Sequence, residues 1–364
     1  MSHQSVLALA VISLLASHVP TAVAAPSPPA EPGADRRAVR TEPSTRGDVT
    51  FATMLDRIRV AAESGDWANK GWRDRDLEEG LNGLLEQAMR ATGRKGLELP
   101  VEFDLVRPAA VDAPVGGGGR LHNKLWVSRE PTASAGHAVR SIILADGNVR
   151  VSFATECVII ARGAVEVAHG QRNVILAGHY VHVSHDGNHG ARPRIRPPQL
   201  APERPEPEQD ADEEPPPGSI VLSGGSLDIS HATDTICSAP QLVEIAHANG
   251  VTVVNSPNLR VSHKNDLKEV QAEDLTLAPP EAANPLANRL KVTQVVHNDT
   301  VARRFAALDL GGAEIVVRPG AEIRDGAGKP VPGLEGWKLT FVCEQFALFS
   351  NGREDAGFLA PRER

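Results

Sequence analysis

Hydrophobic residues recur with a period of 16 through the middle of the chain, from about residue 141 to residue 279. Aligned without gaps, the repeat gives six blocks: SIILADGNVRVSFATE (141–156), CVIIARGAVEVAHGQR (157–172), NVILAGHYVHVSHDGN (173–188), SIVLSGGSLDISHATD (219–234), TICSAPQLVEIAHANG (235–250) and VTVVNSPNLRVSHKND (251–266). A seventh, less regular block begins at Leu267. A fixed short period of this kind is typical of a stacked repeat architecture.

Each block contains two short runs with the character of β-strands. Position nine is always Val or Leu, position eleven is Val, Ile or Leu, and position ten between them is polar and variable. This alternation indicates a strand with one buried face. Positions two to four form the second apolar run, as in residues 158–160, and Gly, Asp, Asn and Pro occupy the bends between the runs.

A single block cannot bury its own apolar positions, so the blocks are expected to stack. Stacking places equivalent residues about 4.8 Å apart and lets each strand pair with its counterparts above and below. Opposite charges at position ten fit this register, since Arg150 lies beside Glu166 and Glu244 beside Arg260. The prediction is a mainly β protein, a single-stranded parallel β-solenoid (β-helix) of about seven 16-residue coils. A propeller is excluded because its blades need about 40 residues and hairpin signals.

The N-terminal residues resemble a secretory signal. An apolar run at residues 6–16 is too short to span a bilayer, and residues 22–24 supply the small-residue cleavage pattern. Residues 1–24 are therefore predicted to be a signal peptide. We expect an exported protein, whether periplasmic, at the cell surface or secreted, with no transmembrane segment.

The other segments outside the repeat differ in composition. Residues 25–48 read as a disordered leader, and residues 189–218, with nine prolines and an acidic stretch, as a disordered insertion extruded after the third block. The remaining segments are predicted as a helical segment (49–96) with helices at about 53–63 and 76–92, entry strands to the solenoid (97–140), and a β-rich C-terminal region (280–364). This last region is expected to cap the last coil, whose open edge would otherwise invite aggregation.

One column of the repeat is unusual in its chemistry. Position twelve is always Ser or Ala, and position thirteen carries a histidine in five successive blocks: His169, His185, His231, His247 and His263. Strict alternation would point these rings inward, whereas a corner at position twelve would turn them outward. A structural ladder of stacked neutral imidazoles is the simpler explanation. Metal binding is the sharper hypothesis, because imidazoles on neighbouring coils could reach one Zn²⁺ or Cu²⁺, although no carboxylate recurs beside the column.

Composition and the absence of known motifs exclude several classes of function. A net charge of −8 argues against nucleic acid as a partner, and an aromatic content of 4% leaves few rings on which a sugar could stack. The three cysteines do not form a disulfide framework, although a single bond stays open. We find no nucleophile elbow, phosphate-cradling loop or HExxH motif, so no catalytic residue and no cofactor are assigned.

The Val/Ile-rich blocks with Gly-marked turns resemble bacterial β-solenoid modules of the bactofilin and adhesin kind, over residues 141–279. The resemblance is one of architecture and implies a rod of stacked coils, without functional residues to transfer. The expected function is that of a non-enzymatic exported scaffold or binding protein of the cell envelope, with cell-surface polysaccharide or protein as partner. The alternatives are a polysaccharide-active or carbohydrate-binding β-helix protein and metal binding by the histidine ladder.

Overall fold

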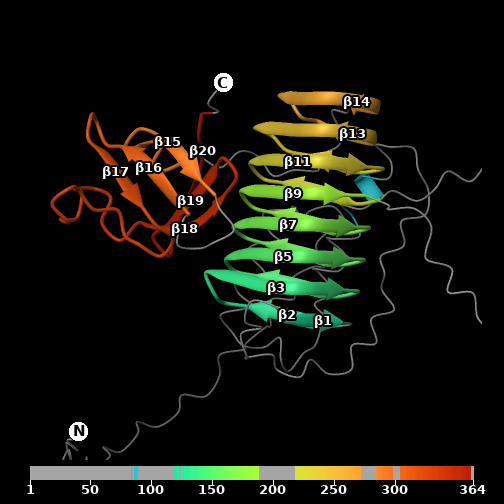
Figure 1. Cartoon of the computed structure of the whole chain (residues 1–364), viewed down its shortest axis with the longest axis horizontal. Helices are drawn as coiled ribbons and strands as arrows, with labels where there is room; N and C mark the ends of the chain where they lie inside the picture. Colours follow the sequence, from blue (N-terminus) through green and yellow to red (C-terminus); the bar gives the residue numbers. More distant parts are fainter. Residues whose placement is uncertain are drawn as a thin grey trace, which may run out of the picture. The chain divides into compact units, whose positions relative to one another are not determined.

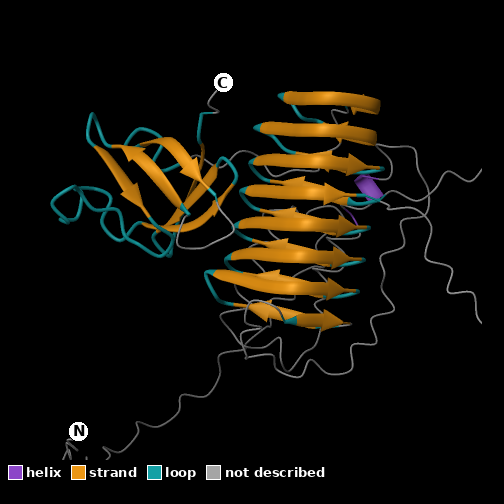
Figure 2. Ribbon diagram, in the orientation of Figure 1, coloured by secondary structure: helices purple, strands orange, loops and turns teal. Residues whose placement is uncertain are grey.

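The computed structural model describes residues 83, 86–88, 119–122, 124–187, 218–271, 284–297 and 304–361. Strands dominate these residues (Figure 2), as the sequence predicted. Gly83 and residues 86–88 are helical and lie in the helix predicted at 76–92. The predicted signal peptide, the leader, the helix at 53–63 and nearly all of the insertion lie outside the described residues.

One parallel sheet of 14 strands forms the repeat region, a β-solenoid of about seven turns. Its strands are β1 (Arg120–His122), β2 (Leu125–Ser128), β3 (Thr132–Val139), β4 (Ile142–Ala145), β5 (Asn148–Thr155), β6 (Val158–Ala161), β7 (Ala164–Gln171), β8 (Val174–Ala177), β9 (Tyr180–Asp186), β10 (Ile220–Ser223), β11 (Ser226–Thr233), β12 (Ile236–Ser238), β13 (Leu242–Val254) and β14 (Leu259–Val270). Figure 1 shows the longer strands of successive coils stacked one above another. The long strand β13 turns a corner and pairs with both β11 and β12, which joins the two faces of the solenoid into one sheet.

The register confirms the 16-residue period. Val149 pairs with Val165, and Val165 pairs with Val181. The next pair is Val181 with Leu227, across the predicted insertion, so the coils before and after it are direct neighbours. An insertion at a bend leaves both ladders of backbone hydrogen bonds continuous, which is why the repeat resumes in phase.

The solenoid core is made of the positions that the repeat marks as apolar. Side chains at positions nine and eleven, such as Val165 and Val167, are fully buried. Strands β4, β6, β8 and β10 are buried at every position, so both of their faces are covered. Burying one such Val, Ile or Leu side chain contributes about 1.5–3 kcal/mol, and repetition over the coils makes the core continuous.

A further coil precedes the first block that sequence inspection detects. Leu125 pairs with Ile142, 17 residues on, whereas Thr132 pairs with Asn148, 16 residues on. The predicted entry strands thus form a complete coil with one extra residue in its bend. The extra residue hides the period, and Ala133 and Ala135 replace the larger apolar residues at positions nine and eleven.

The bend that closes a coil has a left-handed backbone wherever the structure describes position sixteen. At position sixteen, Arg140, Glu156, Arg172, Asp234 and Asp266 have φ values of 48–57°. A left-handed conformation is energetically unfavourable for a non-glycine residue. It is kept here because the strand ladders on both sides of the bend fix the backbone. Glu156 accepts from Arg140 and Arg172 at 2.9 Å each, so ion pairs link three coils along this corner.

The C-terminal region is β-rich, as expected. Its strands form two antiparallel sheets of three: β15 (Lys291–Val296), β16 (Phe305–Asp309) and β17 (Glu314–Val317), then β18 (Lys338–Cys343), β19 (Phe346–Ser350) and β20 (Asp355–Leu359). Both sheets share one core, which contains Trp337 and Phe349. We call residues 284–297 and 304–361 the C-terminal module.

The module contacts the side of the coils, which corrects the expectation that it caps the last one. Tyr180 of β9 stacks on Phe346 with ring centroids 4.3 Å apart. Arg162 lies 2.6 Å from Asp355, and Gln345 donates to Glu244 at 3.0 Å. The polar residues at position ten supply partners for the module, and they explain why it packs on this face.

Candidate functional site

The rings at position thirteen form one continuous stack on the outside of the solenoid. We call it the ring ladder; its members, one from each of seven coils, are His137, Phe153, His169, His185, His231, His247 and His263. Neighbouring ring centroids lie 4.5–5.1 Å apart with interplanar angles of 3–20°. All of the rings are exposed except that of His185, which is half-buried. His137, from the coil that sequence inspection missed, begins the stack.

A bend at position twelve decides the outward direction. In the register between β11 and β13, Ile229 pairs with Ile245 and the next pair is His231 with His247, so Ser230 lies outside the regular pairing. The inside–outside alternation shifts at this residue. Position thirteen therefore points outward and position fourteen inward, where Ala232 is buried. A small residue at position twelve suits the tight bend, and of the two orientations left open by the sequence, the structure adopts the outward one.

The surface beside the ring ladder can form hydrogen bonds but carries no charge at positions twelve and fifteen of the described coils. Position twelve is Gly, Ser or Ala in every described coil, and the outward residues at position fifteen include Thr155, Gln171, Thr233 and Asn249. Since each ring face lies against its neighbours, the ring edges carry the exposed nitrogen atoms. A neutral imidazole offers one donor and one acceptor. The surface thus offers an imidazole in six of the seven coils, with Phe153 as the exception.

Stacking also makes His247 harder to protonate. Shielding from water lowers the pKa of His247, and the neighbouring His263 and His231 lower it further because their charges would repel its own.

A second group of polar side chains lies where position ten meets the C-terminal module. Arg150 on β5 approaches Glu166 on β7 at 2.6 Å and donates to the carbonyl oxygen of Val342 at 2.6 Å. Its guanidinium also lies 4.4 Å from the centroid of the Phe341 ring. The expected pairing of Arg150 with Glu166 is confirmed, and the module adds partners from outside the repeat.

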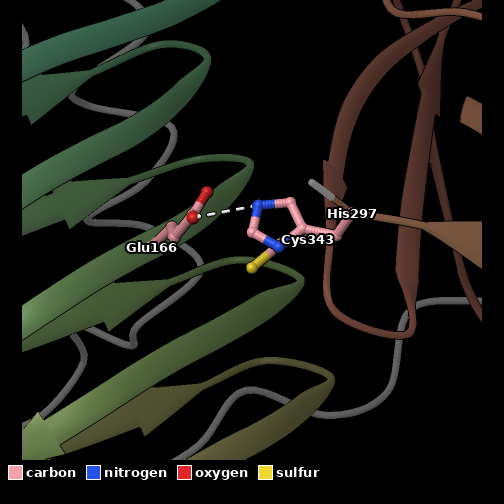
Figure 3. A group of neighbouring side chains, drawn as sticks. All are labelled: Glu166, His297 and Cys343. Carbon is pink, nitrogen blue, oxygen red and sulfur yellow. Dashed lines mark ion pairs between the residues drawn. The ribbon is translucent and has the colours of Figure 1, made fainter. Parts of the chain in front are cut away.

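Glu166, His297 and Cys343 meet at this junction (Figure 3), and we call them the junction cluster. Glu166 lies on β7, His297 directly follows β15, and Cys343 ends β18. One ligand atom from each residue lies within 4.8 Å of the others. His297 Nε2 is 3.2 Å from Glu166 Oε1, and its Nδ1 is 3.7 Å from Glu344 Oε1.

The surroundings of the junction cluster shift the pKa values of all three of its residues. Burial would raise the pKa of Glu166, but the hydrogen bond from His297 and the charge of Arg150 outweigh it and lower that pKa to about 2. Hydrogen bonds to Glu166 and Glu344 raise the pKa of His297 to about 9. Burial raises the pKa of the Cys343 thiol well above its usual value. The carboxylate and the imidazole therefore form an ion pair beside a neutral thiol.

Sequence reasoning did not find the junction cluster. Glu166 belongs to the variable column at position ten, and His297 and Cys343 lie in the part of the chain that has no period. The question of a disulfide is answered by the structure, in which Cys157, Cys237 and Cys343 are all free and buried. Burial raises the pKa of Cys157 to about 11 and that of Cys237 to about 12.

A cleft of about 340 Å³ lies between the bends of the early coils and the module. Charged residues line it, including Asp146, Arg162, Lys338 and Asp355. Arg162 binds Asp146 at 2.9 Å and Asp355 at 2.6 Å, so both carboxylates are held by one guanidinium. The ion pairs of Arg162 therefore fill the cleft with paired charges between the solenoid and the C-terminal module.

Comparisons with protein-family models, with curated proteins and with solved structures found no match. Among the described residues, no helix has the length and apolar character needed to cross a membrane.

Proposed function

We propose that this chain is a non-enzymatic exported scaffold or binding protein of the cell envelope, and that the ring ladder is its binding surface. The observation that carries the proposal is the exposure of the ladder, which presents one ring per coil in an unbroken row. A residue that only filled a corner of the coil would not need to expose the nitrogen atoms of an imidazole to solvent. Export rests on the signal-like residues 1–24.

The proposed partner is a neutral, hydroxyl-rich polymer, namely a cell-surface polysaccharide. Hydroxyl groups both donate and accept, which matches the neutral imidazole edges and the Ser, Thr, Gln and Asn side chains beside them. A charged polymer would find no repeated opposite charge at positions twelve, thirteen and fifteen. Each hydrogen bond contributes about 0.5–1.5 kcal/mol, so several adjacent coils must bind together to give useful affinity.

The parallel stacking of the rings argues against metal binding by the ring ladder. Lone pairs of an imidazole lie in the plane of its ring, and the planes of His231 and His247 are 10° from parallel with centroids 4.6 Å apart. Lone pairs on two such rings run side by side and do not converge on one ion. Chelation would require the rings to leave the stack.

Binding to insoluble polysaccharides tests the proposal. The full chain is mixed with cellulose or chitin, and depletion from the supernatant is measured after centrifugation. We expect depletion by at least one polymer, and an affinity about tenfold or more weaker for the triple variant His169→Ala/His185→Ala/His231→Ala, which loses three ring edges. The variant Arg140→Ala/Arg172→Ala, altered at an exposed corner of the solenoid away from the ring ladder, is the matched control and should bind as the wild type does.

The outcomes are distinct. A wild-type chain that neither polymer depletes, or a triple variant that is folded by circular dichroism and binds undiminished, would refute the ladder as the binding surface. Release of soluble saccharides from the polymer would refute the non-enzymatic assignment and favour the polysaccharide-active alternative. Export is tested by cell fractionation, with a mature N-terminus expected at Ala25.

A further inference from the structure

We propose that Glu166, His297 and Cys343 form a binding site for a divalent metal ion of the Zn²⁺ type, at the junction between the solenoid and the C-terminal module. A carboxylate, an imidazole and a thiol are the three side-chain ligands that Zn²⁺ uses in proteins. They come from three elements that are far apart in the sequence (Figure 3), and they converge with their ligand atoms within 4.8 Å of one another.

The spacing is close to that of a bound site. Zn–ligand bonds of about 2.0–2.3 Å place tetrahedral ligands about 3.3–3.8 Å apart. His297 Nε2 and Glu166 Oε1 already lie 3.2 Å apart. A shift of about 1 Å in the remaining ligand atoms brings all three to bonding distance.

The orientation of His297 also fits a ligand. Its Nε2 faces Glu166, while its Nδ1 lies 3.7 Å from Glu344 Oε1. A metal-bound histidine characteristically offers its second nitrogen to a carboxylate, which fixes the ring and makes the ligand more basic. Glu344 occupies that place. The sequence neighbours Cys343 and Glu344 would thus serve as ligand and as supporting carboxylate.

Glu166 keeps one oxygen available. Its Oε2 is held by Arg150 at 2.6 Å, with Arg304 at 4.0 Å, and its Oε1 faces His297. The two guanidinium groups therefore orient the carboxylate without occupying the oxygen that points into the cluster. A metal ion at Oε1 leaves the ion pair with Arg150 in place.

The buried thiol of Cys343 is a second, independent indication of a ligand. Its side chain is 0% exposed, and its Sγ has no hydrogen-bond partner among the described residues. One side of it packs on the cluster that contains Phe341 and Phe346, but the sulfur lies beside a carboxylate and an imidazole. An alanine or a valine would fill that space without placing an unpartnered polar atom among charges. A metal ion gives the sulfur a partner.

The ligand set balances the charge of the ion. A metal ion binds a thiolate and a neutral imidazole, so the carboxylate of Glu166 and the thiolate of Cys343 together supply two negative charges against its two positive charges. Because no net charge is added to a buried site, the ion avoids the desolvation penalty that an uncompensated charge would meet. The bound ion would also link β7 to β18 and so tie the module to the solenoid.

Cobalt titration of the full chain tests this site. Protein freed of metal by a chelator is titrated with Co²⁺ and then with Zn²⁺. We expect one Co²⁺ per chain, with the near-ultraviolet absorption of a cobalt–thiolate bond, and displacement of that ion by Zn²⁺. Zn²⁺ should also raise the melting temperature of the wild type, and the chelator should reverse the effect.

Variants assign the ligands. Cys343→Ser should abolish the thiolate absorption and weaken Zn²⁺ binding by more than about 100-fold, and His297→Gln should weaken it similarly. The matched control is Cys237→Ser, which removes another fully buried thiol and should leave the titration unchanged. The ladder triple variant should also retain the site, which separates it from metal bound by surface histidines.

Two results would overturn the proposal. The first is a wild-type titration without stoichiometric binding or thiolate absorption, a result that depends on no variant folding correctly. The second is persistence of that absorption in Cys343→Ser. Because the ring ladder is not part of this site, failure here leaves the polysaccharide proposal intact.

Discussion

The imidazoles of His247 and His263 lie face to face, with ring centroids 4.5 Å apart and planes 9° from parallel, although 16 residues separate them along the chain. This spacing is close to the separation of neighbouring strands, about 4.8 Å. The stack therefore follows the backbone ladder, and each ring takes the position that the coil beneath it dictates. Protonation of adjacent rings would place like charges at this distance.

Protonation of the ring ladder is predicted to lower stability as the pH falls from about 6.5 to 5, a range in which the contribution of His297, whose pKa is raised, stays constant. His247 has a lowered pKa in the folded chain, between His231 and His263, whereas an unfolded histidine has a pKa of about 6.5. The unfolded chain therefore binds the proton more readily, and the stability present above about pH 6.5 is lost as the pH drops through it toward the lower folded pKa. Thermal melts at pH 7.5, 6.5, 5.5 and 5 check this.

His247→Phe is the matched control for the pH series. Phe153 shows that a phenyl ring stacks within the ladder, at 4.7 Å from His137 and 4.8 Å from His169. The substitution keeps the stack, removes the titrating group between His231 and His263, and should reduce the pH dependence. A wild-type melting temperature that does not change between pH 6.5 and 5 would contradict the prediction.

Tyr180 gives a test of the junction with the module. Its ring is buried and stacks on Phe346, while its hydroxyl has no hydrogen-bond partner within the described part of the chain. Tyr180→Ala should cost about 3–5 kcal/mol through the lost ring and the cavity it leaves. Tyr180→Phe removes only the unpaired hydroxyl and should be neutral or stabilising. Urea unfolding of the two variants separates them, and an equal loss in both would mean that the hydroxyl, not the ring, holds the contact.

Asp186 gives a test of the solenoid beside the predicted insertion. Its buried carboxylate accepts hydrogen bonds from the hydroxyls of Ser219 and Thr235, each at 2.7 Å. Asp186→Ala should cost about 1–3 kcal/mol, because buried hydroxyls lose an acceptor. Alanine fits the site sterically, since Ala154 and Ala232 occupy the same block position in other coils. Thermal melts of this variant and of the exposed control Glu269→Ala measure the effect. Equal melting temperatures for the two variants would show that the hydrogen bonds to Asp186 contribute nothing to stability.

Much of the fold follows from the sequence because every coil repeats one environment. Val149, Val165 and Val181 recur at one block position, and stacking is the arrangement that buries all of them together. The same reasoning placed residues 189–218 as an insertion after the third block, and the coils on either side of it pair in phase. It failed for residues 124–140, where one extra residue in a bend and two alanines in the core obscure the period.

The candidate sites depended on tertiary structure to different degrees. The repeat identified the histidine column, but the outward direction of His231 and its neighbours was decided by the bend at Ser230, which lies outside the regular pairing of the ladder. No sequence pattern joins Glu166 to His297 and Cys343, since a 16-residue period says nothing about an aperiodic segment. The sequence alone determined the period, the core and the column of rings, because those depend on contacts between identical coils. Only the packing of the module on position ten decided the junction cluster, because that contact joins residues with no common register.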